Sequence, residues 1–462
     1  MPAPSRISAE ARLEKGLSAG TLVRYATGSI GTGGFGTLPG LVLLIFLTDT
    51  LGVAAFWGGV LITVAKIWDV VIDPVIGARS DHSLAVTGSR RRYMLLGALL
   101  LPVFFVLTFA VPAGLPPLVS GIWVLVAFML TATAFSLFQV PYIALPAELV
   151  QDYDARTRLL SARVVVLSFA ILLFGAGGPE IRDAFGSDER LGYLVLAIVA
   201  GVVIGVGMLV AVFSAPRNVR GVEVARSSIA ENYRLGFAAL RRSQPFRALL
   251  ATFVLQGLAT GMMLAGASYI ARWVLDTGVA VLFVSLIAPA ILCAPLWGLI
   301  SRRTGKERAF VIASILFGLA ALSLVGLIWA PGPWLYGPVA LAGAAYAGMQ
   351  SLPMSMLPDV ISHDARSHGI GRAGSFGGMW TAGETAGMAL GTTVLAIILG
   401  VAGYLESTDA EVVTQSASAI AGIVLSFSVA PAVIIGLSLL TLARYPLRKH
   451  DIDTDAAKGP AA

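Results

Sequence analysis

The stretch that decides the fold is FWGGVLITVAKIWDVVIDPVIG, residues 56–77, an apolar segment that contains three ionisable side chains. Its length suits a membrane helix, which needs about 20 mainly apolar residues. Lys66, Asp69 and Asp73 are separated by three and four positions, so on a helix they lie on one face. Each such charge costs about 2.5–3.5 kcal/mol at the centre of a membrane helix. The face is therefore predicted to point into a helix bundle rather than toward lipid.

The composition of the whole chain also indicates a membrane protein. Of its 462 residues, 57% are hydrophobic and only 13% are charged, whereas an ordinary soluble domain carries about 25% charged residues. Twelve apolar segments predict an all-α membrane protein with twelve transmembrane helices. The predicted spans are residues 22–48, 54–77, 93–113, 119–146, 159–177, 192–214, 247–270, 276–300, 309–330, 333–357, 375–401 and 417–443.

Basic residues are distributed unevenly among the loops between these spans. With both termini inside, the outer loops contain only Arg182, Arg190 and Arg272, and 28 of the 32 Lys and Arg lie in the tails, in the inner loops or beside them. Cytoplasmic loops are enriched in Lys and Arg. We therefore expect a multi-pass protein of a bacterial-type cytoplasmic (inner) membrane with both termini in the cytoplasm. The net charge of +6 follows from this topology and does not indicate nucleic-acid binding.

Two inner-loop motifs indicate an internal repeat. LPAELVQDYDART (145–157) follows the fourth span, and LPDVISHDARSH (357–368) follows the tenth, about 212 residues later. Two six-helix repeats joined by a long cytoplasmic loop are the layout of the major facilitator fold, in which substrates bind between the repeats. The predicted organisation, in chain order, is an N-terminal six-helix bundle in 1–214, a central cytoplasmic loop in 215–246, a C-terminal six-helix bundle in 247–445 and a cytoplasmic tail in 446–462.

The second span and its following loop, WDVVIDPVIGARSDHSLAVTGSRRRYMLLGA (68–98), resemble the signature of the glycoside–pentoside–hexuronide:cation symporters, typified by bacterial melibiose permease. The similarity extends to QVPYIALPAELVQDYDARTRL (139–159) and LPDVISHDARSHGIGRAG (357–374). The resemblance implies that Asp69 and Asp73 bind the coupling cation, Na⁺ or H⁺. Carboxylate oxygens are suitable ligands for such hard cations.

The chain departs from this family at three positions that bind sugar there. Gly33 stands in place of an Asp on the first helix, Gln139 in place of an acid on the fourth, and Thr385 in place of a Lys on the eleventh. These departures weaken the expectation of galactoside specificity. Gln139 remains a candidate for both cation and substrate binding.

Other polar or aromatic residues within or beside the spans are candidates for substrate binding and gating. Glu384 is an acid deep in the eleventh span, and a charge at such a depth indicates function or a pair with another helix. Tyr25, Tyr346 and Gln350 are weaker candidates. The predicted substrate-binding residues are Lys66, Trp68, Gln139, Tyr142, Trp380, Glu384 and Thr385. The predicted gating residues of the inner loops are Arg79, Asp81, Arg91, Arg92, Glu148, Asp152 and Arg158.

The leading hypothesis is a monomeric, cation-coupled secondary transporter that moves a small solute, such as a sugar or glycoside, across the lipid bilayer by alternating access. Two alternatives remain open: a transporter or exporter of an organic anion, amphiphile or lysolipid on the same fold, and a non-transporting membrane sensor. The sequence offers no set of catalytic residues typical of a hydrolase and no nucleotide-binding motif. An enzyme is therefore not expected. No cofactor is expected either, apart from the coupling ion, Na⁺ or H⁺.

Overall fold

The computed structural model describes residues 18–149, 153–186, 188–216, 240–368, 373–407 and 413–447. These residues form long helices joined by short connections. The first half consists of α2 (Ala19–Thr27), α3 (Ser29–Ile45), η1 (Phe46–Thr50), α4 (Ala55–Thr87), α5 (Arg91–Phe109), α6 (Pro117–Leu149), α7 (Tyr153–Asp183) and α8 (Glu189–Val212). The second half consists of α10 (Gln244–Ile270), η2 (Ala271–Leu275), α11 (Val279–Thr304), α12 (Lys306–Ser323), η3 (Leu324–Ile328), η4 (Pro333–Leu335), α13 (Tyr336–His368), α14 (Ala373–Val401), α15 (Ala417–Phe427) and α16 (Val429–Leu442).

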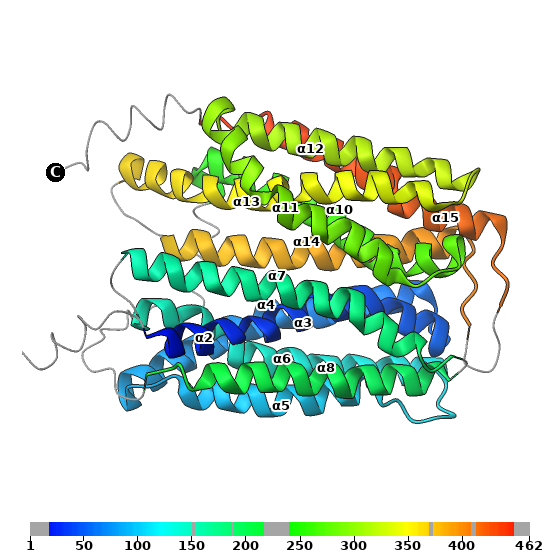
Figure 1. Cartoon of the computed structure of the whole chain (residues 1–462), viewed down its shortest axis with the longest axis horizontal. Coiled ribbons are helices and arrows are strands. Elements are labelled where there is room, and N and C mark those ends of the chain that lie inside the picture. Colours follow the sequence, from blue (N-terminus) through cyan, green and yellow to red (C-terminus); the bar gives the residue numbers. More distant parts are fainter. Residues whose placement is uncertain are drawn as a thin grey trace, which may run out of the picture.

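The helices lie roughly side by side in two halves, with α12 and α13 toward the top of Figure 1 and α5 and α8 toward the bottom. The halves meet where α3 packs on α10, α4 on α14 and α7 on α11. Ten segments of the described chain are long and apolar enough to cross a membrane, and α4 and α13 complete the twelve predicted spans. We call the end of the bundle where α2 begins and α16 ends the terminal end, and the opposite end the far end.

The first span is interrupted where the sequence predicted a single helix. α2 ends at Thr27, and α3 begins at Ser29. A Cβ atom at Gly28 would lie 2.5 Å from the Tyr142 ring and 2.9 Å from Ala211. Glycine therefore lets the side chain of Tyr142 approach the backbone at the point where the two helices join.

Close backbone contact also joins α10 to α14. A Cβ atom at Gly391 would lie 2.3 Å from the Leu258 carbonyl oxygen, and one at Gly387 would lie 2.6 Å from that of Val254. Small residues permit such approach between membrane helices. The contact fixes the position of α14, and hence of Glu384, relative to α10.

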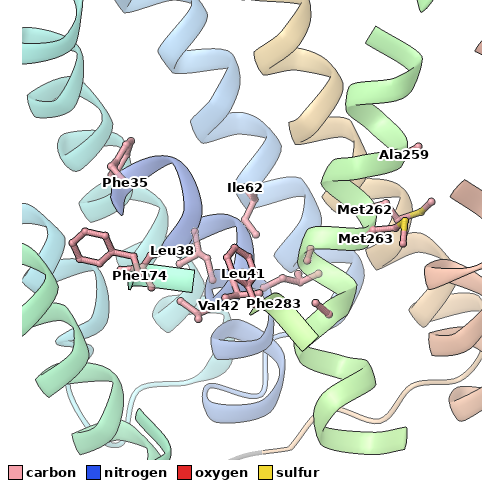
Figure 2. Packing of buried hydrophobic residues seen from close by; sticks show 14 of the residues in the cluster. Phe35, Leu38, Leu41, Val42, Ile62, Phe174, Ala259, Met262, Met263 and Phe283 are labelled. Carbon is pink, nitrogen blue, oxygen red and sulfur yellow. The ribbon is translucent and has the colours of Figure 1, made fainter. Parts of the chain in front are cut away.

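Apolar side chains pack against one another where the halves meet. Figure 2 shows Leu38, Leu41 and Val42 of α3 near Phe283 of α11 and Met263 of α10. All five belong to one cluster of buried residues. This packing surrounds the polar features described next.

Candidate functional site

The acidic face of α4, by which we mean Lys66, Asp69 and Asp73, contains one ion pair. The Lys66 ammonium donates to Asp69 Oδ2 over 3.2 Å. It also lies 5.5 Å from the Phe35 ring centre and 5.7 Å from that of Phe128, which adds cation–π attraction. This pair lowers the cost of placing three charges in one span.

The remaining oxygens of the acidic face are not satisfied. Asp69 Oδ1 and Asp73 Oδ1 are buried and have no hydrogen-bond partner among the residues that the structure describes. A buried carboxylate oxygen without a partner is costly, so such groups usually bind a proton or a cation. The two carboxylates lie one helical turn apart on the same face. Chemically, this arrangement can accept H⁺ or Na⁺.

α6 supports the acidic face from the side. Trp68 Nε1 donates to Thr133 Oγ1 over 2.8 Å, and the Ser136 hydroxyl lies within reach of the Asp73 carboxylate. One turn further along α6, Gln139 Oε1 accepts a hydrogen bond of 2.8 Å from Thr32. The polar groups of Trp68 and Gln139 therefore form hydrogen bonds between helices. Thr32, the partner of Gln139, lines the cavity between the halves, so Gln139 lies beside that cavity.

A cavity of about 280 Å³ lies between the halves. Four of its lining residues carry a polar side chain: Thr32 and Thr37 of α3, Thr260 of α10 and Tyr346 of α13. Substrate sites of such transporters lie at the interface of the two repeats. The remaining lining residues are Gly33, Gly36, Leu167, Ile171, Met263, Leu264, Phe283, Leu286, Ile287, Phe317 and Met388.

Gly33 lies at the position where the resembling family has a sugar-binding Asp. A Cβ atom there would approach Ala170 Cβ to 2.7 Å and the Leu167 carbonyl oxygen to 3.1 Å. α3 and α7 are thus too close to admit a side chain at this point. The cavity lacks this acid for a packing reason, and an acid cannot be restored there without moving a helix.

Glu384 and Thr385 of α14 lie on the second-half side of this region. Glu384 lines a small pocket that adjoins the central cavity and shares Thr260 and Tyr346 with it. Thr385 is half-buried and does not line the central cavity. Of the weaker candidates, Tyr346 lines both spaces and Gln350 lines the small pocket.

The structure places two predicted substrate residues in packed regions and not among the residues that line the central cavity, so their role in substrate binding stays a prediction. Tyr142 is fully buried, its hydroxyl donates to the Tyr25 carbonyl over 2.8 Å, and its ring stacks 4.7 Å from that of Tyr25. Trp380 is 2% exposed, and its ring stacks 4.3 Å from that of Phe253. Both aromatic rings join neighbouring helices.

The predicted gating residues make contacts within the first half. Asp81 forms an ion pair with Arg90, and the Arg91 guanidinium lies 4.8 Å from the Phe213 ring centre. The structure places Arg79, Arg92 and Arg158 at exposed positions. The side chain of Glu148 and all of Asp152 lie outside the described residues. A gating role for these residues stays a prediction.

The sequence analysis missed a polar network at the far end, which joins the two halves. We call it the far-end network. The Asp49 carboxylate accepts from Tyr404 Oη over 2.6 Å and from Trp273 Nε1 over 3.2 Å, and it lies 3.5 Å from Arg272. Arg272 also pairs with Glu189 at 2.9 Å. The further members are Thr48, Thr50, Tyr269 and Ser407.

Asp49 connects the halves because it lies on η1 while most of its donors lie on η2 and in the segment after α14. Its side chain is fully buried. The motif LTDT at the end of the first span (47–50) and Arg272 at the end of the seventh were the available signals. Neither signal identifies its partner, because the partners are more than 220 residues apart in sequence.

A twelve-helix membrane protein with two halves around a central cavity is a secondary transporter of the major facilitator type. The sequence from 24 to 449 matches the family described as MFS/sugar transport protein, and the chain belongs to that family. The resemblance in the second span is thereby confirmed.

Relatives and solved structures support this placement. The chain is 25% identical over 437 residues to a glucuronide carrier protein homolog of Escherichia coli (strain K12), with 93% of each chain covered. It is 23% identical over 418 residues to an isoprimeverose transporter of Lactiplantibacillus pentosus, covering 89% of this chain and 85% of that one. A bacterial homolog of the human lysosomal transporter Spinster, solved inward-facing and unoccupied, has the same fold, with a TM-score of 0.67 and 13% identity over 98% of this chain and 99% of that one.

Proposed function

We propose that this transporter is driven by a cation, Na⁺ or H⁺, that binds to Asp69 and Asp73. The observation that carries the proposal is the pair of buried carboxylate oxygens on α4 that have no partner among the described residues. A bound cation would reduce the cost of these unpartnered oxygens, and Lys66 already neutralises one of the two charges. Binding of one cation therefore leaves the acidic face close to neutral.

The contacts at the two ends support transport by alternating access, with the far end closed here. The far-end network joins the halves through Asp49, Tyr404 and Arg272. At the terminal end, the ion pair Lys306–Asp359 stays within the second half, and Arg242, just before α10, pairs with Asp364 of α13. We further propose that the terminal end is cytoplasmic, because basic residues gather there. This conformation then faces inward.

For the substrate we propose a small sugar or glycoside, because the relatives are named for a glucuronide and for isoprimeverose. A second candidate is an amphiphile, which the many apolar side chains of the cavity wall favour. We propose that the protein acts as a monomer, since one chain supplies both halves of the cavity.

The test compares Asp69→Asn and Asp73→Asn with the unchanged chain in proteoliposomes, with Asp183→Asn as the control. Asp183 is an exposed acid that pairs with its neighbour Arg182. Uptake driven by a Na⁺ or proton gradient should be lost in both α4 variants, while exchange of substrate without a gradient persists. The control should keep both activities. Concentrative uptake at the normal rate by both α4 variants would contradict cation coupling at this face.

A further inference from the structure

A second group of unpaired acceptors lies in the second half, separate from the acidic face of α4. The small pocket beside the central cavity is lined by Glu384 of α14, Gln256 of α10 and Gln350 of α13. It adjoins the central cavity, with which it shares the wall residues Thr260 and Tyr346. We call it the acceptor pocket.

The hydrogen bonds around Gln256 fix the direction of its amide. Its side-chain nitrogen lies 2.8 Å from Ser314 Oγ and 3.3 Å from Ser438 Oγ. Each of these hydroxyls donates its only proton to a backbone carbonyl, that of Phe310 and that of Ile435 respectively. Both hydroxyls must therefore accept from Gln256, so its NH₂ group points toward them. Gln256 Oε1 is left buried without a donor among the described residues.

Glu384 is the second acceptor of the pocket. Within the described part of the chain no Lys or Arg pairs with it and no side chain donates a hydrogen bond to it, whereas Asp69 has Lys66 at 3.2 Å. The Tyr346 hydroxyl accepts from Gln350 Nε2 over 2.7 Å, so its own proton remains available. The residues that line the pocket thus carry a carboxylate, an amide oxygen without a donor and a hydroxyl whose proton is free.

Such a set of acceptors favours a ligand group that is both positively charged and rich in N–H donors. A buried acceptor without a partner is costly, and hydrogen bonds that involve a charged group are stronger than neutral ones. The adjoining central cavity has apolar walls that include Phe283, Phe317 and Met388. A ligand that fills both spaces has an apolar face and an ammonium end.

We propose that the acceptor pocket binds the protonated amine of the transported solute while the apolar face of the solute lies in the central cavity. The substrate class is an amine-bearing amphipathic molecule, either an amino-substituted glycoside or a simple apolar amine. This assignment rests on the proposed transport function. It disfavours an organic anion, because the carboxylate of Glu384 would repel it.

The first experiment measures thermal stabilisation of the purified full-length protein by two matched sets of probes. One set shares a cyclohexyl ring and carries an amine, an alcohol or a carboxylate: cyclohexylmethylamine, cyclohexylmethanol and cyclohexanecarboxylate. The other compares phenyl glucosaminide with phenyl glucoside. The amine should bind at least about tenfold more tightly than the matched neutral probe, since hydrogen bonds to charged groups contribute about 1.5–3 kcal/mol. The set with the larger effect identifies the source of the amine. No stabilisation by either amine overturns the proposal.

The second experiment uses Glu384→Gln and Gln256→Leu, with Glu180→Gln as a matched control on an exposed glutamate at the far end of α7. Glu384→Gln should weaken amine binding about ten- to hundredfold and leave binding of the alcohol unchanged. Gln256→Leu should weaken amine binding less, because it removes a neutral acceptor. The control should bind as the unchanged chain does. Equal amine binding by the Glu384→Gln variant and the unchanged chain contradicts the proposal.

The two proposals fail in different ways. Asp73→Asn should lose gradient-driven uptake and keep its amine binding. Retained coupling in that variant contradicts the coupling site alone, whereas retained amine preference in Glu384→Gln contradicts the acceptor pocket alone.

Discussion

Asp49 and Asp73 are both buried carboxylates of the first half, but their surroundings differ. Asp49 accepts hydrogen bonds from Thr48, Trp273 and Tyr404 and lies beside Arg272. Asp73, in contrast, keeps one buried oxygen with no partner among the described residues. A satisfied buried acid fixes the groups around it, whereas an unsatisfied one is available to a ligand. This difference is the reason that we propose closure of the far end for Asp49 and cation binding for Asp73.

The two acids also differ in what they join. The donors of Asp49 come mainly from the second half, so its hydrogen bonds exist only while the halves are in contact at the far end. Asp73 and its neighbours on α4 and α6 belong to one half. The acidic face can therefore move as a unit with its half, and the far-end network must break whenever the far end opens.

The largest expected effect comes from Asp49→Asn. The amide group would face the N–H donors of Trp273 and Arg272, and removal of one partner from a buried ion pair costs about 3–5 kcal/mol. The far end should open more often. The measurement is the labelling rate of Ser268→Cys, in a Cys293→Ser background, by an impermeant maleimide added outside. Ser268 is buried one turn inside the network, and its labelling should accelerate at least about tenfold.

The control for this experiment is Asp183→Asn in the same background. Asp183 also lies at the far end, but its carboxylate is exposed, and its pair with Arg182 stays within α7. A pair with an exposed member is screened by solvent and contributes about 0–1 kcal/mol. Labelling in the control should stay unchanged. An unchanged rate in Asp49→Asn as well would show that the network does not hold the far end closed.

Lys66→Met should have an effect of intermediate size, and it should strengthen cation binding at the acidic face. Removal of the ammonium at 3.2 Å leaves the charge of Asp69 without its partner. The coupling cation should then bind more tightly, and half-saturation should need roughly tenfold less Na⁺ or H⁺. The measurement is the cation dependence of thermal stabilisation and of substrate exchange.

The matched control is Lys306→Met, because Lys306 forms the comparable pair with Asp359 at 2.5 Å in the second half. Its cation dependence should equal that of the unchanged chain. If Lys66→Met loses substrate binding with no change in cation dependence, Lys66 is a substrate ligand instead of a competitor of the cation.

Thr63→Val should have the smallest effect of the three. Thr63 of α4 shares a hydrogen bond with Thr393 of α14 across the halves, between the levels of Asp49 and Asp73. Loss of one such bond costs about 0.5–1.5 kcal/mol, so labelling at Ser268→Cys should rise only a few-fold. Thr108→Val, which removes a hydrogen bond to Thr131 within the first half, should leave the labelling rate unchanged. Equal labelling rates in Thr63→Val and Thr108→Val would show that the Thr63–Thr393 hydrogen bond does not help to close the far end. The far-end network would then close it without this bond.

Much of the fold could be predicted from the sequence. Apolar length predicted the twelve spans, and the repeated inner-loop motifs predicted two halves, because the bilayer requires long helices and duplication preserves loop motifs. The break at Gly28 was not predicted, and neither was the close approach of the Tyr142 ring there, which comes from a distant helix. Glycine in an apolar span does not by itself indicate a break.

The candidate site was predicted only in part. Spacing along α4 placed Lys66, Asp69 and Asp73 on one face, since a single helix determines that geometry. The packed positions of Tyr142 and Trp380 could not be predicted, because the direction of an aromatic side chain depends on neighbouring helices. Their burial against Tyr25 and Phe253 became visible only in the assembled bundle.

By itself the sequence determined that this chain crosses a membrane in two related halves and carries a charged face on its second span. These properties depend on hydrophobicity and on local periodicity, which neighbouring residues set. Only the tertiary structure decided which acids are satisfied. The Asp49 donors Trp273 and Tyr404 lie more than 220 residues away, and the direction of the Gln256 amide depends on two other helices. The partners of a buried polar group are known only when the helices that surround it are placed.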